Sequence, residues 1–311
     1  MSIESSWVVI ALITPFLFTA FWTLSATGSP FTASFRTLYN KRICLLIAHP
    51  DDEAMFFSPT VLALTRPELG NHVKILCLST GDADGLGETR KKEIQKSAVH
   101  LGLRHESDVF VIDDRSRFPD SMTTEWSTRD ISALLASAFA PELSSSKNHS
   151  SANGNGHAAE NGPKATIDVI LTFDEHGVSN HPNHRSLYHG AVAFLKSLMK
   201  DKSGYSCPVA LYTLTTTNIA RKYSGIFDFP LTMLLGAVNT IRDSLGPSKS
   251  ASSSKDADFA NRLLYVSSFN QWARARTAMT DGHKSQMLWF RWGWITIGRY
   301  MFVNDLKQER I

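Results

Sequence analysis

The chain has 311 residues, of which 43% are hydrophobic and 20% are charged, a balance typical of a globular protein with a sizeable core. Its net charge of +3 is too small to indicate nucleic-acid binding, and no basic run is interleaved with aromatic residues. The three cysteines, Cys44, Cys77 and Cys207, are odd in number and far apart, which argues against a disulfide framework and indicates a reducing compartment.

The N-terminal segment departs from this soluble pattern. No Asp, Glu, Lys, Arg or His occurs between Glu4 and Arg36, and residues 7–26 are almost continuously apolar. That length is about the 20 residues that a helix needs to cross a bilayer. A cleaved signal peptide is the alternative, but such a peptide normally begins with basic residues, and none precedes Arg36. We therefore expect residues 1–35 to form a retained transmembrane anchor.

Two further features orient this anchor. Trp7 and Trp22 lie near the two ends of the apolar segment, where indole rings favour the membrane interface. Lys and Arg occur only on its C-terminal side, first at Arg36, Lys41 and Arg42. By the positive-inside tendency, we expect a single-pass protein whose main domain faces the cytosol.

The rest of the chain alternates short apolar runs with helical patterns. The runs expected to form buried strands are residues 43–48, 73–78, 109–112, 167–173 and 209–214. Helices are expected at residues 53–64, 89–101, 126–140 and 184–199. This alternation predicts an α/β fold with a Rossmann-like, mostly parallel sheet and helices on both faces. In such sheets, functional sites form at the carboxyl ends of the strands.

Three segments stand out from the core pattern. Residues 143–163, rich in Ser, Asn and Gly, and residues 248–258, rich in Ser and Lys, are expected to be disordered insertions in a main domain of residues 42–306. Residues 287–303 carry six aromatic side chains and two arginines. This composition suits a bilayer interface, but it equally suits a core helix packed on the sheet, and the sequence leaves both possibilities open.

The first cluster of chemically active residues is His49-Pro50-Asp51-Asp52-Glu53, directly after the first predicted strand. His49 and Asp52, three residues apart on a strand-to-helix turn, can both point at one cation. Adjacent carboxylates are costly unless a cation offsets their charges, and catalytic zinc takes three protein ligands. Asp51 would then be free to act as a base. An acidic helix start would explain the three acidic residues, but not the preceding His49 and Pro50.

The second cluster is Asn180-His181-Pro182-Asn183-His184, which follows the fourth predicted strand by a short loop. His184 could complete a set of two histidines and one aspartate, with His181 facing the substrate. A pair of histidines at this spacing is a weak signal alone, but both strands would present their loops at the same edge of the sheet. This donor set suits Zn²⁺, although Fe²⁺ and other divalent ions also accept it.

Weaker features surround these clusters. The Gly-rich loop at residues 79–87 could hold sugar hydroxyls through Asp82, and it lacks the spacing of a phosphate-binding loop. Glu53 could orient a neighbouring residue from behind. Asp174 or Glu175 could orient a histidine ligand in the same way, or could simply be solvated. His283 could bind a phosphate group or cap a helix, and the structural interpretation is favoured.

Taken together, residues 48–53 and 181–184 resemble the two motifs of the PIG-L/LmbE family of metal-dependent de-N-acetylases. The resemblance covers most of residues 42–306. Four features are similar to the eukaryotic branch of the family. They are residues 171–174, residues 177–181, the late His-Lys-Ser-Gln at 283–286 and the N-terminal anchor. That branch acts at the endoplasmic reticulum.

This resemblance implies a role for each motif residue. The metal ligands would be His49, Asp52 and His184. Asp51 would be the general base, and His181 would stabilise the oxyanion and protonate the leaving amine. Arg90 is similar to a family arginine that contacts the substrate. Some bacterial members have a tyrosine where this chain has Ser179, so a tyrosine contribution to oxyanion binding is not expected here.

The function that the resemblance implies is hydrolysis of the N-acetyl group of N-acetylglucosaminyl-phosphatidylinositol, the second step of glycosylphosphatidylinositol anchor synthesis. The expected partners are this glycolipid and the membrane of the endoplasmic reticulum, with the catalytic domain on the cytosolic side and no nucleic acid. The alternatives are a de-N-acetylase of another acetylated amino sugar conjugate and a catalytically dead membrane scaffold. Because every proposed ligand, base and acid is present, the scaffold is the weaker alternative.

Overall fold

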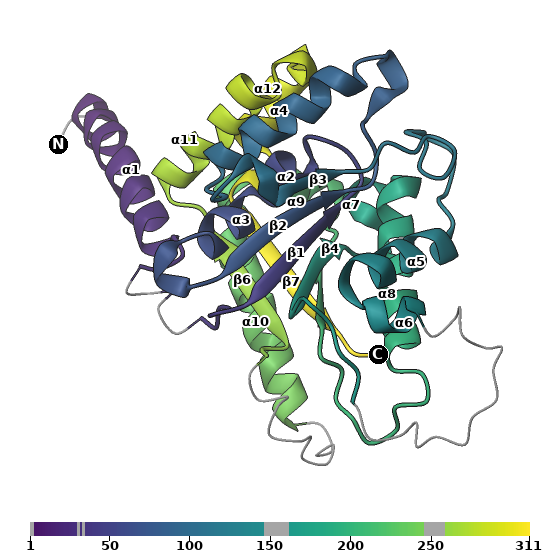
Figure 1. The fold of residues 1–311 in the computed structure, drawn as a ribbon. Helices are drawn as coiled ribbons and strands as arrows, with labels where there is room; N and C mark the ends of the chain where they lie inside the picture. The colour runs from purple at the N-terminus through teal and green to yellow at the C-terminus, as the bar shows by residue number, and fades with distance from the viewer. Residues whose placement is uncertain (1–2, 30–31, 33–34, 146–161, 246–258) are drawn as a thin grey trace, which may run out of the picture.

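The structure is a computed structural model that describes residues 3–29, 32, 35–145, 162–245 and 259–311. Its centre is a seven-stranded sheet in the order β3-β2-β1-β4-β5-β7-β6 (Figure 1). The strands are β1 (Arg42–Ile47), β2 (His72–Cys77), β3 (Val109–Val111), β4 (Val169–Phe173), β5 (Ala210–Leu214), β6 (Arg262–Val266) and β7 (Val303–Glu309).

The first five strands pair in parallel, and β7 pairs antiparallel with both β5 and β6. Every residue of β4 and β5 is buried, and so is every residue of β1 after Arg42. Continuous burial is typical of central parallel strands, because helices cover both faces of the sheet. The carboxyl ends of β1 and β4 lie side by side, which brings the two sequence motifs together.

Helices cover the sheet on both sides (Figure 1). One face carries α5 (Thr128–Phe139) and α8 (Pro182–Leu198), and the other carries α3 (Ser58–Leu64), α4 (Gly87–His100) and α11 (Phe269–Thr277). The other α-helices are α1 (Ile3–Ser25), α2 (Asp52–Met55), α6 (Pro141–Ser145), α7 (Gly177–Asn180), α9 (Ile219–Lys222), α10 (Asp228–Leu245) and α12 (Trp289–Ile297). The predicted α/β class and the five predicted strands are therefore confirmed.

Three details differ from the sequence prediction. The expected helix at residues 53–64 is divided into α2 and α3, and strands β6 and β7 were not predicted.

All three cysteines are free thiols, as expected. The predicted insertions fall mostly on residues 146–161 and 248–258, which lie outside the described residues, whereas residues 143–145 belong to α6.

Helix α1 extends from the domain with its N-terminal end directed away from it (Figure 1). Its C-terminal end is attached, since Trp22 is buried and its indole Nε1 donates a hydrogen bond to the Ser267 carbonyl over 2.7 Å. The same ring packs against Trp272 and Phe302. Within the described part of the chain, no helix has the length and apolar character required to cross a membrane.

The aromatic C-terminal segment divides into an exposed part and a buried part. Trp294 and Tyr300 are buried in the core. Trp289, Phe290 and Trp292 are 86%, 48% and 49% exposed. The core interpretation therefore holds for the second half of the segment, while the first half of α12 presents its aromatic rings to the surroundings.

Candidate active site

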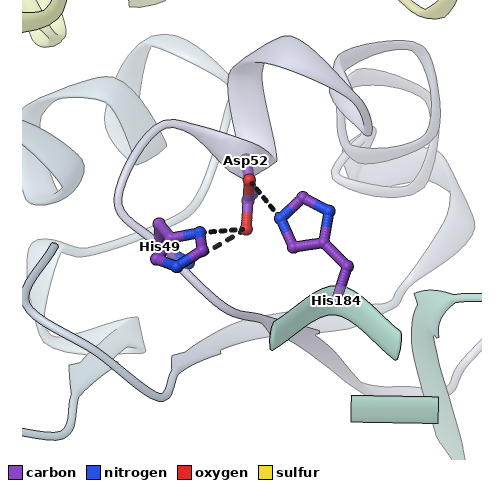
Figure 2. Close-up of side chains that lie close together, drawn as sticks. All are labelled: His49, Asp52 and His184. Carbon is purple, nitrogen blue, oxygen red and sulfur yellow. Dashed lines mark hydrogen bonds and ion pairs between the residues drawn. The ribbon is translucent and has the colours of Figure 1, made fainter. Parts of the chain in front are cut away.

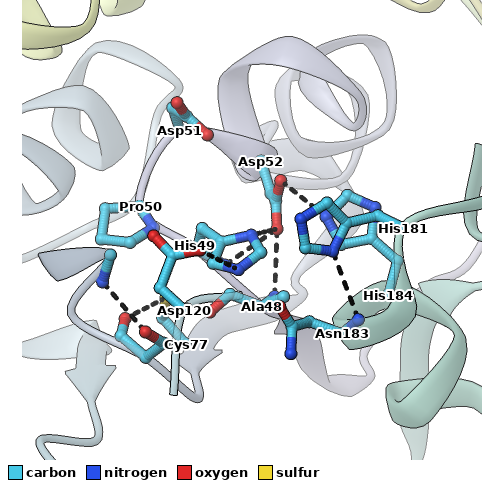
Figure 3. A network of polar contacts seen from close by, with 12 residues as sticks. Ala48, His49, Pro50, Asp51, Asp52, Cys77, Asp120, His181, Asn183 and His184 are labelled. Carbon is cyan, nitrogen blue, oxygen red and sulfur yellow. Dashed lines mark hydrogen bonds and ion pairs between the residues drawn. The ribbon is translucent and has the colours of Figure 1, made fainter. Parts of the chain in front are cut away.

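The turn after β1 fixes the first motif. Asp52 begins α2 and folds its carboxylate back, so that Oδ2 accepts hydrogen bonds from the backbone N–H groups of Ala48 (3.0 Å) and His49 (2.9 Å). Asp51 has a φ of 116°, in the region that residues other than glycine rarely adopt. The result is that the Asp52 carboxylate points toward the histidines whereas the Asp51 carboxylate points away from them (Figure 3).

Three buried side chains converge beside this turn (Figure 2). His49 Nδ1 lies 3.9 Å from Asp52 Oδ2, and His184 Nε2 lies 3.3 Å from Asp52 Oδ1. One ligand-type atom from each of the three residues lies within 4.8 Å of the others. The structure thus brings together the three residues predicted as metal ligands.

His184 is held in place from two sides. Its ring stacks on Phe173 at the end of β4, with the centroids 3.9 Å apart and the planes 2° apart. Its Nδ1 lies 3.1 Å from the Gly177 carbonyl, which fits a proton on Nδ1 donated to that oxygen. The lone pair of Nε2 then faces Asp52, which is the orientation that a metal-ligating imidazole needs.

These residues fit a metal ion by their own chemistry. The Nε2 atom of His184 is buried and lacks a hydrogen-bond partner of good geometry. Buried polar nitrogens without partners are uncommon because they lose the hydrogen bonds that water would supply. Two imidazoles and one carboxylate in a tight cluster are a typical three-ligand set for catalytic zinc.

Charges within the cluster shift the pKa values of its members. Burial alone would raise the pKa of the Asp52 carboxyl, but the charges of His184 and His49 and their hydrogen bonds outweigh it and lower that pKa. Burial alone would lower the pKa of His49, but contact with Asp120 and the charge of Asp52 raise it. Asp52 is therefore ionised, as a ligand to a cation must be.

His181 lies beside the ligand set at the start of α8. Its ring centroid is 4.9 Å from those of both His49 and His184. Nδ1 accepts a hydrogen bond from the Asn183 backbone N–H over 3.2 Å, so the neutral ring carries its proton on Nε2. Burial and the charges of His184 and His49 lower the pKa of His181 to about 4. At neutral pH, His181 is therefore a neutral N–H donor.

Asp120 is a site residue that the sequence analysis missed. It lies in the loop between β3 and α5, and its Oδ1 is 3.3 Å from His49 Nε2 (Figure 3). With His49 and His181 it forms a second group of ligand-type atoms within 4.8 Å of one another. A carboxylate behind a histidine ligand orients the ring. Its position after a predicted strand was the available signal, but Asp113 and Asp114 share that signal.

Two guanidinium groups face Asp51. Arg291 of α12 places Nη1 2.9 Å from Asp51 Oδ2, and Arg90 of α4 places Nη2 3.5 Å from the same oxygen. Arg90 also donates to the carbonyls of Gly81 (2.7 Å) and Pro50 (2.6 Å). Arg90 therefore lies at the site as predicted and connects two of its loops, and its contact with substrate stays a prediction. Arg291 was not predicted.

Beneath the turn, Glu53 forms a buried hydrogen-bonded group. Its Oε2 accepts from the Asp51 backbone N–H over 3.1 Å, and its Oε1 lies 2.6 Å from His283 Nε2 and 2.5 Å from Ser97 Oγ. Burial alone would lower the pKa of His283, but the charge of Glu53 and its hydrogen bond raise it. Glu53 thus supports the backbone of Asp51. His283 has a structural role, as the sequence favoured, but it pairs with Glu53 and its side chain does not cap the short helix that follows it.

Asp82 serves the backbone of the loop after β2. Its Oδ1 accepts a hydrogen bond from the Gly87 N–H over 2.6 Å, at the first residue of α4. Its other oxygen pairs with Arg115. These contacts occupy the carboxylate in the structure, so the predicted contact of Asp82 with sugar hydroxyls requires one of them to be exchanged.

Asp174 holds the loop after β4. Its carboxylate accepts from the Gly177 N–H (3.0 Å) and from both the N–H and the hydroxyl of Thr216 (2.6 Å each). The Gly177 carbonyl in turn faces His184. Asp174 therefore supports His184 through the loop backbone and not by contact with its ring.

Relatives of the chain decide its class. A protein of Arthroderma benhamiae named N-acetylglucosaminyl-phosphatidylinositol de-N-acetylase is 56% identical over 96% of this chain and 97% of its own length. The family model described as PIG-L, GlcNAc-PI de-N-acetylase, matches residues 44–195, which include both motifs. The chain belongs to this de-N-acetylase family. A Bos taurus member with the same name is 35% identical over 86% of this chain and 83% of its own.

Solved structures show a more distant likeness. The zinc-inhibited form of teicoplanin deacetylase matches 86% of this chain and 97% of its own chain, at a TM-score of 0.46 and 10% identity. The N,N'-diacetylchitobiose deacetylase of Pyrococcus horikoshii, in complex with an inhibitor, matches 86% and 84%, at a TM-score of 0.37 and 18% identity.

Proposed function

We propose that this family member removes the acetyl group of N-acetylglucosaminyl-phosphatidylinositol by hydrolysis, giving glucosaminyl-phosphatidylinositol and acetate. This reaction is the second step of glycosylphosphatidylinositol anchor synthesis. The observation that carries the proposal is the buried cluster of His49, Asp52 and His184, with Asp51 and His181 at its rim. The relatives that share nearly the whole chain are named for this activity.

The cluster would hold one divalent ion, with His49, Asp52 and His184 as ligands. Zn²⁺ fits two imidazoles and a carboxylate best. When bound, such an ion polarises the amide carbonyl and makes water a stronger nucleophile at neutral pH. The chain itself orients these ligands, through the backbone N–H groups on Asp52 and the Phe173 ring stacked on His184.

Asp51 and Glu53 are the acidic residues of the turn outside the ligand set. Because Glu53 is engaged with His283 and Ser97, we assign Asp51 the role of general base. It accepts a proton from the water that attacks the amide carbon, a contribution worth on the order of 10²–10⁴-fold in rate. Its unusual backbone conformation is stabilised by the hydrogen bond from its N–H to Glu53. This geometry keeps the base separate from its neighbour Asp52.

His181 would act on the other side of the amide. As a neutral ring with the proton on Nε2, it can donate a hydrogen bond to the oxyanion that forms on the carbonyl oxygen. The departing amine must also gain a proton. The proton that Asp51 takes from the attacking water balances this gain. Because the pKa of His181 is about 4, a His181 ring that takes up this proton would pass it on readily to the amine.

We also propose attachment to the endoplasmic reticulum membrane through the predicted anchor at residues 1–35, with the catalytic domain in the cytosol. The support is the absence of charged residues between Glu4 and Arg36 and the exposed apolar side chains of α1, such as Trp7 and Phe16. Alkaline extraction and protease protection of microsomes test this. Release of the chain by alkali, or protection of its C-terminal domain, would contradict it.

Acetate release from N-acetylglucosaminyl-phosphatidylinositol by the purified full chain tests the reaction. We expect release that a chelator abolishes and that added Zn²⁺ restores. N-acetylglucosamine supplied as a free sugar is the comparison substrate and should be a much poorer one. Equal release from the free sugar would favour a broader amino sugar de-N-acetylase, and no release from either substrate would contradict the proposal.

A further inference from the structure

Helix α12 packs its inner face directly against the helix that begins at Asp52. The Trp294 indole Nε1 donates a hydrogen bond to the Met55 carbonyl over 3.1 Å, and its ring lies 5.4 Å from the Phe56 ring. From the same helix, Arg291 reaches Asp51. The position of α12 is therefore fixed at the rim of the candidate active site.

The outer face of α12 is strongly apolar and exposed. Its large side chains, with their exposed fractions, are Trp289 (86%), Phe290 (48%), Trp292 (49%) and Ile297 (50%), and Leu288 just before the helix is 57% exposed. Exposed large hydrophobic residues are ordinary when scattered, but a cluster on one short helix marks an interaction surface. Because the inner face contacts Asp51 and Met55, this surface lies beside the candidate active site.

The apolar surface continues from α12 toward α1. The Tyr223 ring, which is partly exposed, lies 5.9 Å from the ring of Trp294. Phe227, in the short helix η5 (Gly225–Phe227), is 67% exposed and packs on Phe18 of α1 at 5.5 Å. The exposed rings thus form a continuous band between the rim of the site and the N-terminal helix.

The basic residues beside this band are largely neutralised within the protein. Arg221 and Arg299 pair with Asp228, and Arg291 pairs with Asp51. The attraction of the band for a bilayer therefore comes from its exposed aromatic rings. Indole rings with arginine between them are favoured at the interface of a bilayer.

We propose that the band formed by the outer face of α12 with Tyr223 and Phe227 rests on a phospholipid bilayer and holds the active site at its surface. This inference rests on the proposed function, because a substrate with acyl chains in the bilayer must bring its sugar to the site without leaving the membrane. The band lies at the rim through which that sugar enters, so its occupant is the membrane that contains the substrate.

Lipid contact is tested with the full chain reconstituted into vesicles of phosphatidylcholine and phosphatidylserine that contain a nitroxide-labelled lipid. A fluorophore is placed on Trp289→Cys and, as a control, on Phe110→Cys of edge strand β3, whose phenylalanine is 49% exposed. We expect the nitroxide lipid to quench the fluorophore at position 289 and not at 110. Equal quenching at both positions, or none at 289, overturns the proposal. Without lipid, a fluorescence change at position 289 that depends on protein concentration would indicate contact with a second copy of the chain. That result would also overturn the proposal.

Activity provides the second measurement. The double variant Trp289→Ser and Trp292→Ser should release acetate about tenfold more slowly from substrate in vesicles, because it loses apolar contact with the bilayer. It should act normally on a water-soluble analogue without acyl chains, and Phe110→Ser should act normally on both. An equal loss on both substrates would indicate damage to the site, and no loss on vesicles would exclude the contact. Only inactivity of the unchanged chain on both substrates would contradict the proposed function itself.

Discussion

Asp51 and Asp52 are adjacent in sequence but have opposite surroundings. Asp52 faces two histidines and two backbone N–H groups in a buried cluster. Asp51 faces the guanidinium groups of Arg90 and Arg291 at the rim. The left-handed conformation of Asp51 separates them, so one turn can supply both a ligand and a base. The difference shows that backbone conformation, as much as residue type, assigns the roles.

The largest expected effect comes from removing a histidine ligand from the cluster around Asp52. His184→Ala should remove the bound metal and lower acetate release by about 10³-fold or more, because the several kcal/mol of stabilisation supplied by the ion are lost. Metal analysis and acetate release on the same preparation check this. His189→Ala, an exposed histidine of the same helix, is the matched control and should change neither. Full metal content in His184→Ala would remove it from the ligand set.

A slightly smaller effect is expected from His181→Ala, a change beside the two ligand histidines. It should lower kcat by roughly 10²–10³-fold, the usual effect of losing one oxyanion donor, and leave the metal content unchanged. Steady-state kinetics with metal analysis measures both quantities. Loss of the metal would instead place His181 among the ligands.

Asp120 supports the Asp52 side through His49. Asp120→Asn should weaken metal binding by about 10–100-fold, because the carboxylate that orients a ligand histidine is lost. Titration against a competing chelator gives the affinity. Asp113→Asn breaks only a surface pair with Lys91 and serves as the control. Equal affinities for the two variants would leave Asp120 without a role at the metal.

The Glu53–His283 pair supports the backbone of Asp51. The loss of this pair has the smallest expected effect. In the folded protein the pKa of His283 is raised. The contribution of the pair to the free energy of unfolding is therefore complete below the ordinary pKa of about 6.5, and it decreases as the pH rises through the raised pKa. The free energy of unfolding of the chelator-treated chain, minus that of His283→Gln, should therefore decrease with rising pH. Denaturant unfolding at a series of pH values measures it, and a difference that grows with pH would be opposite to this account.

The sequence predicted the parallel part of the fold because strands buried on both faces read as continuous apolar runs. Strand β7 did not give this signal, since Asp305 and Lys307 interrupt it. Asp305 is accommodated by an ion pair with Arg262 of β6, a partner that lies 43 residues earlier. Pairing between such distant segments leaves no local pattern, so the antiparallel edge emerged only from the structure.

The candidate site shows the same division between local and distant information. His49, Asp52 and His184 lie at fixed spacings after apolar strands, which made them recognisable as a set. Asp120 and Arg291 belong to a long loop and to an aromatic helix, and neither stands in a spacing that indicates its position. Their contacts with His49 and Asp51 depend on how loops meet at the sheet edge, and a single sequence does not contain that information.

The central claim is that Asp52 holds the metal while Asp51 moves the proton. The most direct measurement compares Asp51→Asn with Asp52→Asn for metal content and acetate release in parallel preparations. We predict that Asp51→Asn keeps its metal and loses activity by about 10²–10⁴-fold, while Asp52→Asn loses both. Loss of the metal from Asp51→Asn, or full metal content in Asp52→Asn, would contradict the claim.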